Sequence, residues 1–269
     1  MTVRKVYGVP HVINAVDIAA GEFAELGGVN KFGRSTDVDS GVATDIWDGA
    51  NATDTTPVWV APTQARVHNV KSTSTGDDGS PAGVGARTVQ LYGLTSWDAD
   101  EVSEIITLNG TTNVATANAY VIVHRIKVLT SGGTAINVGV ITATAVTDGT
   151  VTAQINAGEG QTQMAIYGVP STQIALMSQY YASAIKGSTS LAVKIEVLVN
   201  ANPDAQLTNF LIKHTIGLTT EGNNYIRHRF PELWPFKIAG PAIIKITGNS
   251  SAANTDVSAG FDLTLHAVS

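Results

Sequence analysis

The chain has 269 residues, of which 43% are hydrophobic and only 14% are charged, and its formal net charge is −6. It contains no cysteine, so disulfides and thiolate metal sites are excluded. A nucleic-acid groove needs a basic stripe, and the longest basic cluster is Arg227-His228-Arg229, so we expect no nucleic-acid partner. No stretch reaches the roughly 18 apolar residues that span a bilayer, so we expect no membrane partner.

The first 56 residues differ from the remainder of the chain. Met1–Ile18 has the pattern of an extended segment, and Gly27–Thr56 is rich in turn-forming residues. Its isolated large apolar residues are Phe32, Ile46 and Trp47. A loop of this length is uncommon inside a compact domain. The alternatives are a mobile tail and an arm that orders against a neighbouring subunit. The aromatic residues favour an extended N-terminal arm over residues 1–56, because disordered tails are usually poor in them.

From Pro57 onward the sequence is a series of short β-strand patterns separated by turn residues. Leu191–Val199 (LAVKIEVLV) alternates apolar and polar residues with period two, which suits a sheet with one buried face. Asn109-Gly110 and Asp148-Gly149 are tight-turn signals, and the second predicts a hairpin. We predict strands near residues 58–61, 66–73, 87–93, 102–108, 120–129, 138–144, 151–155, 162–167, 174–184, 191–199, 207–218, 236–238, 242–247 and 261–267.

Ile174–Ile185 (IALMSQYYASAI) is the segment in which helix and strand compete. Its Ala, Leu, Met and Gln residues favour a helix, whereas its Ile and Tyr residues favour a strand. Pro170 and Gly187 bracket the segment, and its neighbours are predicted strands. We therefore predict a strand here.

The fold class that follows is all-β, an antiparallel β-sandwich with jelly-roll-like character. A seam near Asn156–Gly160 divides the strands into two regions, 57–156 and 157–269, and each is long enough for a small sandwich. One larger sandwich that uses both regions is the alternative.

No residue pattern predicts catalysis, a cofactor or a metal centre. The histidines lack the close spacing of zinc motifs, and no G-x-S-x-G nucleophile elbow occurs. His124 and His214 lie within predicted strands, where we expect hydrogen-bonded residues at a sheet surface or a subunit interface. Asp37–Gly41 opens like a calcium loop but lacks the later ligands, which leaves calcium between subunits open. We expect a protein that is not an enzyme.

Phe230–Phe236 (FPELWPF) concentrates aromatic residues between two prolines, directly after Arg227-His228-Arg229. Aromatic residues and arginine are typical of interface hot spots. The alternatives are a contact with another subunit and a loop that plugs one end of its own sandwich. The residues that we predict at an interface are Phe32, Trp47, Trp59, Arg227, Arg229, Phe230, Trp234 and Phe236.

Several short motifs occur in an order found in a known family. They are Asn30–Arg34, Asp45–Gly49, Gly85–Val89, Glu101–Glu104, Thr107–Thr111, Gly160–Pro170 and Ser258–Asp262. In this order the chain resembles, over residues 30–269, the virion structural proteins of tailed bacteriophages. The chain departs from the family pattern at Ser171-Thr172-Gln173, where Ala-Gly-Lys is common.

The resemblance implies a β-sandwich that assembles symmetrically in a virion built in the cytoplasm of the bacterial host. It implies a homotrimer or another symmetric homo-oligomer, in contact with the major capsid protein or other virion proteins. A capsid decoration or cement protein of the head is the first hypothesis. The alternative is a structural or receptor- and glycan-binding protein of the tail, neck or baseplate. In that alternative, the aromatic residues that could stack on sugars are Tyr92, Trp97 and Tyr225.

Overall fold

The computed structural model describes residues 3–6, 9–12, 17–18, 20–23, 25–49, 58–185, 191–219, 224–231 and 235–268, with the backbone alone for 3–12. The predicted all-β class is confirmed, because 60% of the described residues are in strands and the described part contains no helix after residue 18. Every strand pair within the described ranges is antiparallel, as expected for β-sandwiches, and the jelly-roll character stays a prediction. A separate hairpin near the N-terminus pairs β1 (Val3–Val6) with β2 (Val9–Val12).

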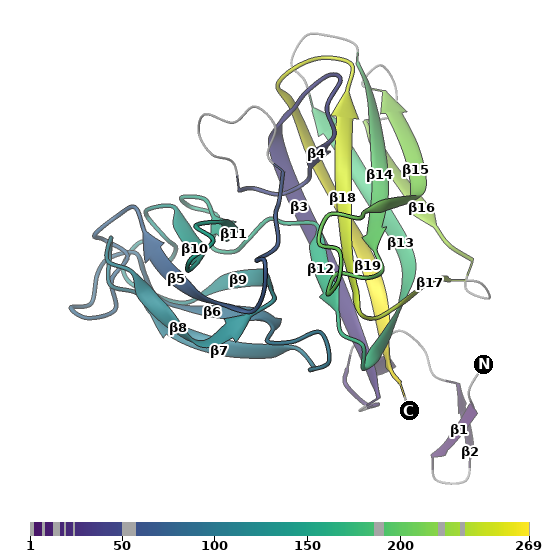
Figure 1. Cartoon of the computed structure of the whole chain (residues 1–269), viewed down its shortest axis with the longest axis horizontal. Coiled ribbons are helices and arrows are strands. Elements are labelled where there is room, and N and C mark those ends of the chain that lie inside the picture. Colours follow the sequence, from purple (N-terminus) through teal and green to yellow (C-terminus); the bar gives the residue numbers. More distant parts are fainter. Residues whose placement is uncertain are drawn as a thin grey trace.

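Residues 66–155 form an N-terminal lobe of two sheets (Figure 1). Its strands are β5 (Arg66–Ser72), β6 (Ala86–Leu94), β7 (Val102–Thr107), β8 (Val114–Tyr120), β9 (Ile122–Ser131), β10 (Ile141–Ala145) and β11 (Val151–Ile155). One sheet has the order β11-β10-β5-β8 and the other β7-β6-β9. The predicted hairpin at Asp148-Gly149 is confirmed, since β10 pairs with β11 and Gly149 has a φ of 71°. This positive φ suits glycine, which has no Cβ to clash.

The C-terminal lobe is a larger two-sheet structure. Its strands are β3 (Leu26–Val38), β4 (Thr44–Asp45), β12 (Ile166–Val169), β13 (Gln173–Ile185), β14 (Ala192–Asn200), β15 (Leu211–Thr219), β16 (Tyr225–Arg229), β17 (Phe236–Ala239), β18 (Ala242–Ser250) and β19 (Thr255–Ala267). One sheet has the order β12-β18-β14-β15, with β4 on β18. The other has the order β16-β13-β19-β3, with β17 on β13. Their facing side chains form one hydrophobic core.

The ambiguous segment at 174–185 lies in β13, so the strand prediction is confirmed. It pairs with β19 along its length, and a register shift interrupts the pairing between Met177 and Gln179. Before the shift the buried residues are odd-numbered, such as Ala175 and Met177, and after it they are even-numbered, such as Tyr180 and Ala182. A β-bulge inserts one residue and so exchanges the faces of a strand. That change of phase is why the segment lacks a clean period of two.

The predicted arm over residues 1–56 needs correction between Leu26 and Asp45. The strand β3 pairs with β19 along most of its length, and β4 pairs with β18, so this segment is part of the C-terminal sandwich. Gly33 shows why the sequence was misleading: a Cβ there would lie 2.3 Å from the Ile46 carbonyl oxygen. The strand needs small residues such as glycine where it packs closely, and the same residues are common in turns, so the sequence of this strand resembles that of a loop. Residues 50–57 lie outside the described residues.

The N-terminal lobe is inserted between β4 and β12 of the C-terminal lobe. The outgoing and returning chains are hydrogen-bonded, with Ala165 N 2.9 Å from Ile46 O and Asp48 N 2.9 Å from Gln163 O. Side chains along the returning segment alternate between the two cores, because Ile166 packs in the N-terminal core and Tyr167 in the C-terminal core. The C-terminal lobe therefore includes residues 26–46 in addition to the predicted region 157–269. The lobes meet along β3, β9 and β12 (Figure 1).

Candidate functional site

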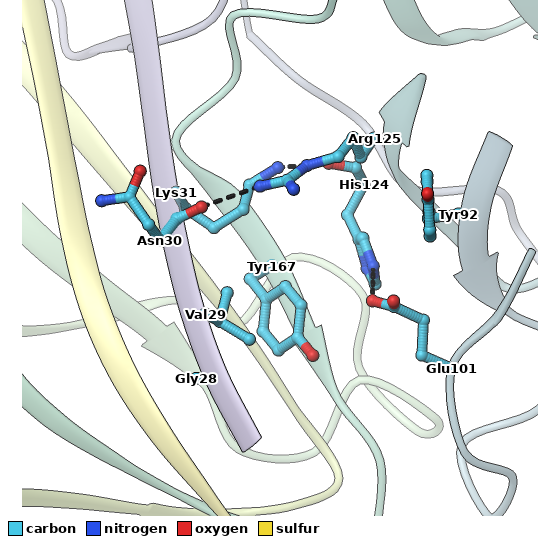
Figure 2. A pocket seen from close by; sticks show the side chains of 9 residues that line it. All are labelled: Gly28, Val29, Asn30, Lys31, Tyr92, Glu101, His124, Arg125 and Tyr167. Carbon is cyan, nitrogen blue, oxygen red and sulfur yellow. Dashed lines mark hydrogen bonds and ion pairs between the residues drawn. The ribbon is translucent and has the colours of Figure 1, made fainter. Parts of the chain in front are cut away.

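A polar pocket lies where the two lobes meet, and we call it the junction pocket (Figure 2). Its volume is about 160 Å³. The residues that line it come from β3, β6, β9, β12 and the segment before β7: Gly28, Val29, Asn30, Lys31, Tyr92, Glu101, His124, Arg125 and Tyr167. Both lobes contribute charged groups, so the pocket forms only when the lobes are packed together.

His124 and Glu101 form an ordered pair on one side of the junction pocket. His124 Nε2 lies 2.5 Å from Glu101 Oε2, and the imidazole is buried. Burial lowers the pKa of His124, although the hydrogen bond to Glu101 acts in the opposite direction. Burial alone would raise the pKa of Glu101, but the hydrogen bond with His124 and the nearby positive charges lower it. The arrangement therefore favours a neutral imidazole whose Nε2–H donates to a carboxylate.

The other ring nitrogen of His124 lacks this support. Nδ1 is buried and has no hydrogen-bond partner among the described residues. With the proton on Nε2, Nδ1 carries a lone pair and is an acceptor. The Tyr167 ring lies against the imidazole, with 4.6 Å between the ring centroids, and it holds the imidazole in place.

Two cationic side chains lie on the opposite side of the pocket from Glu101 (Figure 2). The Lys31 side chain is buried, and its ammonium donates to the backbone carbonyl oxygen of His124. Arg125 Nη2 donates to the backbone carbonyl oxygen of Asn30 over 2.8 Å. Burial, and secondarily the positive charge of Arg125, lower the pKa of Lys31 well below its usual value. These hydrogen bonds tie β3 of one lobe to β9 of the other.

The predicted interface residues Trp47 and Trp59 have a different role in the structure. Their side chains are 5% and 3% exposed and belong to the core of the N-terminal lobe. Trp59 Nε1 donates to the carbonyl oxygen of Thr152 over 2.9 Å, and its backbone N–H donates to Asp45. Both tryptophan side chains are packed against residues of this chain, so neither is available to dock into a neighbour in this conformation.

Three other predicted residues share the outer face of the sheet β16-β13-β19-β3. The strand registers place Phe32, Gly260, Tyr181 and Arg227 in one row across the four strands. The next row carries Asn30, Asp262, Gln179 and Arg229. Both arginines are exposed, and Phe32 is half-buried. Because these residues are far apart in sequence, only the strand pairing brings them to one surface.

Phe230 and Phe236 belong to a cluster of rings at the open side of the C-terminal sandwich. We call it the ring cluster; its members are Tyr180, His214, His228, Phe230 and Phe236. The imidazoles of His214 and His228 are 4.2 Å apart, and Tyr180 Oη lies 2.5 Å from His214 Nδ1. Both phenylalanines pack against the core, as expected for a loop that plugs its own sandwich. Trp234 lies outside the described residues.

The ring cluster brings β15 and β16 together, and each is the last strand of its sheet. Large apolar side chains remain exposed there: Leu211 is 52%, Ile212 56% and Tyr225 47% exposed. We use the name edge surface for the exposed residues of these two edge strands, which are Leu211, Ile212, Tyr225, Arg227 and Arg229. The two arginines were predicted from the sequence, whereas Leu211 and Ile212 were not, because an exposed aliphatic residue in a strand has no distinctive local signal.

The remaining candidates are assigned by their surroundings. Of the residues that were candidates for sugar stacking, Trp97 is buried, Tyr92 lines the junction pocket and Tyr225 is exposed. In the calcium-like segment, the Asp39 carboxylate accepts a hydrogen bond from Asn254 N over 2.9 Å and so fixes the turn before β19. In the described parts of the chain, no group of three or more His, Asp or Glu residues could hold a metal ion.

Comparison with known proteins gives no relative: no family model matches the chain, and no curated protein or solved structure is significantly similar to it. Among the described residues, no helix has the length and apolar character needed to cross a membrane.

Proposed function

We propose that this chain is a structural protein of a tailed-bacteriophage particle that assembles through the edge surface. The observation that carries the proposal is the exposure of Leu211, Ile212 and Tyr225 on adjacent edge strands. Natural sheets usually protect their edges with charges, prolines or covering loops, because an open edge pairs with other chains. Aliphatic and aromatic residues combined with arginine are the composition of a protein–protein contact.

The proposed role is mechanical and non-enzymatic. A neighbouring subunit that covers the edge surface would bury apolar area at about 25 cal/mol per Å² and satisfy the free backbone groups of the strand edge. Repetition of one contact around a symmetry axis multiplies this stabilisation in a closed assembly. The sequence resemblance supports a virion structural protein, and the low charge content fits a decoration or cement protein that packs against its neighbours, which is the role that we propose.

The test of assembly uses a matched pair of substitutions. We expect Ile212→Lys to convert the oligomer of the purified protein to a monomer, as measured by sedimentation velocity or native mass spectrometry. Ile105→Lys is the control, because Ile105 is 61% exposed on the edge strand of the other lobe. A wild-type protein that stays monomeric at high concentration and does not bind particles would contradict the proposal.

The location in the particle is tested by copy number. A head decoration protein is present in numbers on the order of hundreds, because it follows the capsid lattice, whereas a tail, neck or baseplate protein follows a low-order axis. Quantitative mass spectrometry of purified particles separates these alternatives. A glycan-binding role in the tail would use the exposed Tyr225, so Tyr225→Ala would then reduce attachment to host cells and leave the number of copies unchanged. Assembly through the edge surface predicts instead that Tyr225→Ala lowers the number of copies.

A further inference from the structure

The junction pocket contains a buried lysine whose hydrogen-bonding capacity is only partly used. The Lys31 ammonium has three donors, and its hydrogen bond to His124 O uses one of them. Among the described residues, no carboxylate forms an ion pair with Lys31; the Glu101 carboxylate, which accepts a hydrogen bond from His124, acts on the Lys31 ammonium only at longer range. The guanidinium of Arg125 adds a second positive charge to the same cavity. Burial lowers the pKa of Lys31, and an anion bound beside Lys31 and Arg125 would favour the charged ammonium, so the two side chains form a site suited to an anion.

The shape of the junction pocket restricts the anion. A volume of about 160 Å³ is similar to that of a roughly 150 Å³ protein cavity that accommodates benzene. The ligand therefore has about six non-hydrogen atoms, by the same comparison. The Tyr167 ring and Val29 supply an apolar wall on the side away from Arg125 (Figure 2). An inorganic ion would leave that wall without a partner, whereas an organic acid would use both halves of the cavity.

We propose that the junction pocket binds a small organic carboxylate, with the carboxylate between Lys31 and Arg125 and the apolar part against Tyr167 and Val29. A hydroxyl group on the ligand would satisfy the unpartnered acceptor Nδ1 of His124. Because β3 carries Lys31 and β9 carries Arg125, the ligand bridges the two lobes. The site belongs to the single chain and does not rest on the proposed assembly function.

The test is a titration of the purified protein with L-lactate, which has a carboxylate, a hydroxyl and six non-hydrogen atoms. We expect saturable binding with one ligand per chain in isothermal titration calorimetry, and an unfolding temperature that rises with ligand concentration. Lys31→Met keeps the length of the side chain and removes the charge. We expect it to weaken binding roughly tenfold or more, the usual effect of losing a charged hydrogen bond.

The controls separate a specific site from general charge effects. Lys194→Met makes the same change on β14, where Lys194 pairs with Glu196 at the surface, and should leave binding unchanged. Lactamide, which is uncharged, should not bind. If Lys31→Met does not fold, Arg125→Met at the half-buried second cation gives the same test. Absence of saturable lactate binding, equal binding by the variants, or equally tight binding of chloride or phosphate would overturn the proposal, whatever the oligomeric state.

Discussion

The junction pocket and the edge surface place their residues in opposite ways. At the junction, charged side chains such as Lys31 are buried between the lobes, whereas at the edge, aliphatic side chains such as Ile212 are exposed to solvent. Each placement is unfavourable for an isolated chain. A buried charge needs a partner, and a large apolar side chain is unfavourable in contact with water. Both regions therefore suit a binding partner. We propose a small anion for the junction and a neighbouring subunit for the edge.

The largest effect that we expect comes from another buried charge, the ion pair between Asp45 and Lys245. Lys245 Nζ lies 2.8 Å from Asp45 Oδ1, and Asp45 also accepts the backbone N–H of Trp59. Asp45→Ala leaves the ammonium buried without its partner, which typically costs about 3–5 kcal/mol. Urea unfolding measures the loss.

The half-exposed pair of Arg34 and Asp256 is the control for this measurement. Solvent screens such a pair, so Asp256→Ala should reduce the free energy of unfolding by less than about 1 kcal/mol. Equal losses of unfolding free energy in the two variants would contradict the expectation that loss of a partner is more costly for a buried charge than for an exposed one.

A slightly smaller effect should follow from pH in the N-terminal lobe. Burial lowers the pKa of His68 from 6.5 to about 4. Between these values the unfolded chain binds a proton that the folded chain does not, so stability falls as the pH is lowered from about 6.5 to 4. The expected loss is roughly 3 kcal/mol, at 1.36 kcal/mol per pKa unit.

His68→Gln removes the titrating group and serves as the reference for that slope. The two proteins should therefore differ in their pH dependence between pH 7 and 4, as measured by urea unfolding at each pH. Parallel curves would mean that His68 titrates normally in the folded state. If the lobes unfold in separate steps, the slope belongs to the step of the N-terminal lobe.

A moderate effect should come from Gly33 in β3. A Cβ at Gly33 would lie 2.3 Å from Ile46 O and 2.5 Å from Ala165 N, both of which are backbone atoms. Gly33→Ala should therefore destabilise the protein by about 1–3 kcal/mol, the usual cost of overpacking. In the same strand, a Cβ at Gly28 would meet nothing within 4 Å, so Gly28→Ala is the matched control. Equal thermal stability of the two variants would indicate that β3 does not pack in the sandwich.

The smallest effect on stability should come from the edge surface. Ile212 is already exposed, so Ile212→Lys should change the free energy of unfolding of the monomer by less than about 0.5 kcal/mol. Unfolding below the dissociation concentration measures this value. A large loss would mean that Ile212 is a core residue of its own chain, which would remove the contrast with the junction.

Much of the fold could be predicted from the sequence because most strands carry their own signals. Alternation identified β14, and Asp148-Gly149 identified the β10–β11 hairpin. The strand β8 (VATANAY) was missed because its Ala and Asn residues have low β-propensity. The strand β3 was missed because Gly33 and its neighbours serve close packing rather than a turn.

The candidate sites could be predicted only in part, since their residues meet through long-range pairing. Lys31 and His124 are 93 positions apart and come from different lobes, so no local sequence pattern predicts their contact. Trp47 and Trp59 were assigned to an interface because isolated aromatic residues in a turn-rich segment have no visible partner. Their partners, such as Thr152, lie on β11 and could not be located from spacing.

The hydrogen-bonded segments Ile46–Asp48 and Gln163–Ala165, where the chain enters and leaves the N-terminal lobe, bear on how this lobe could be removed or exchanged. The two ends of the inserted lobe lie within hydrogen-bonding distance of each other, as Ile46 O and Ala165 N are 2.9 Å apart. Segments with adjacent ends are tolerated as insertions in other domains. The N-terminal lobe is therefore suited to excision with a short turn in its place, or to exchange for a foreign module.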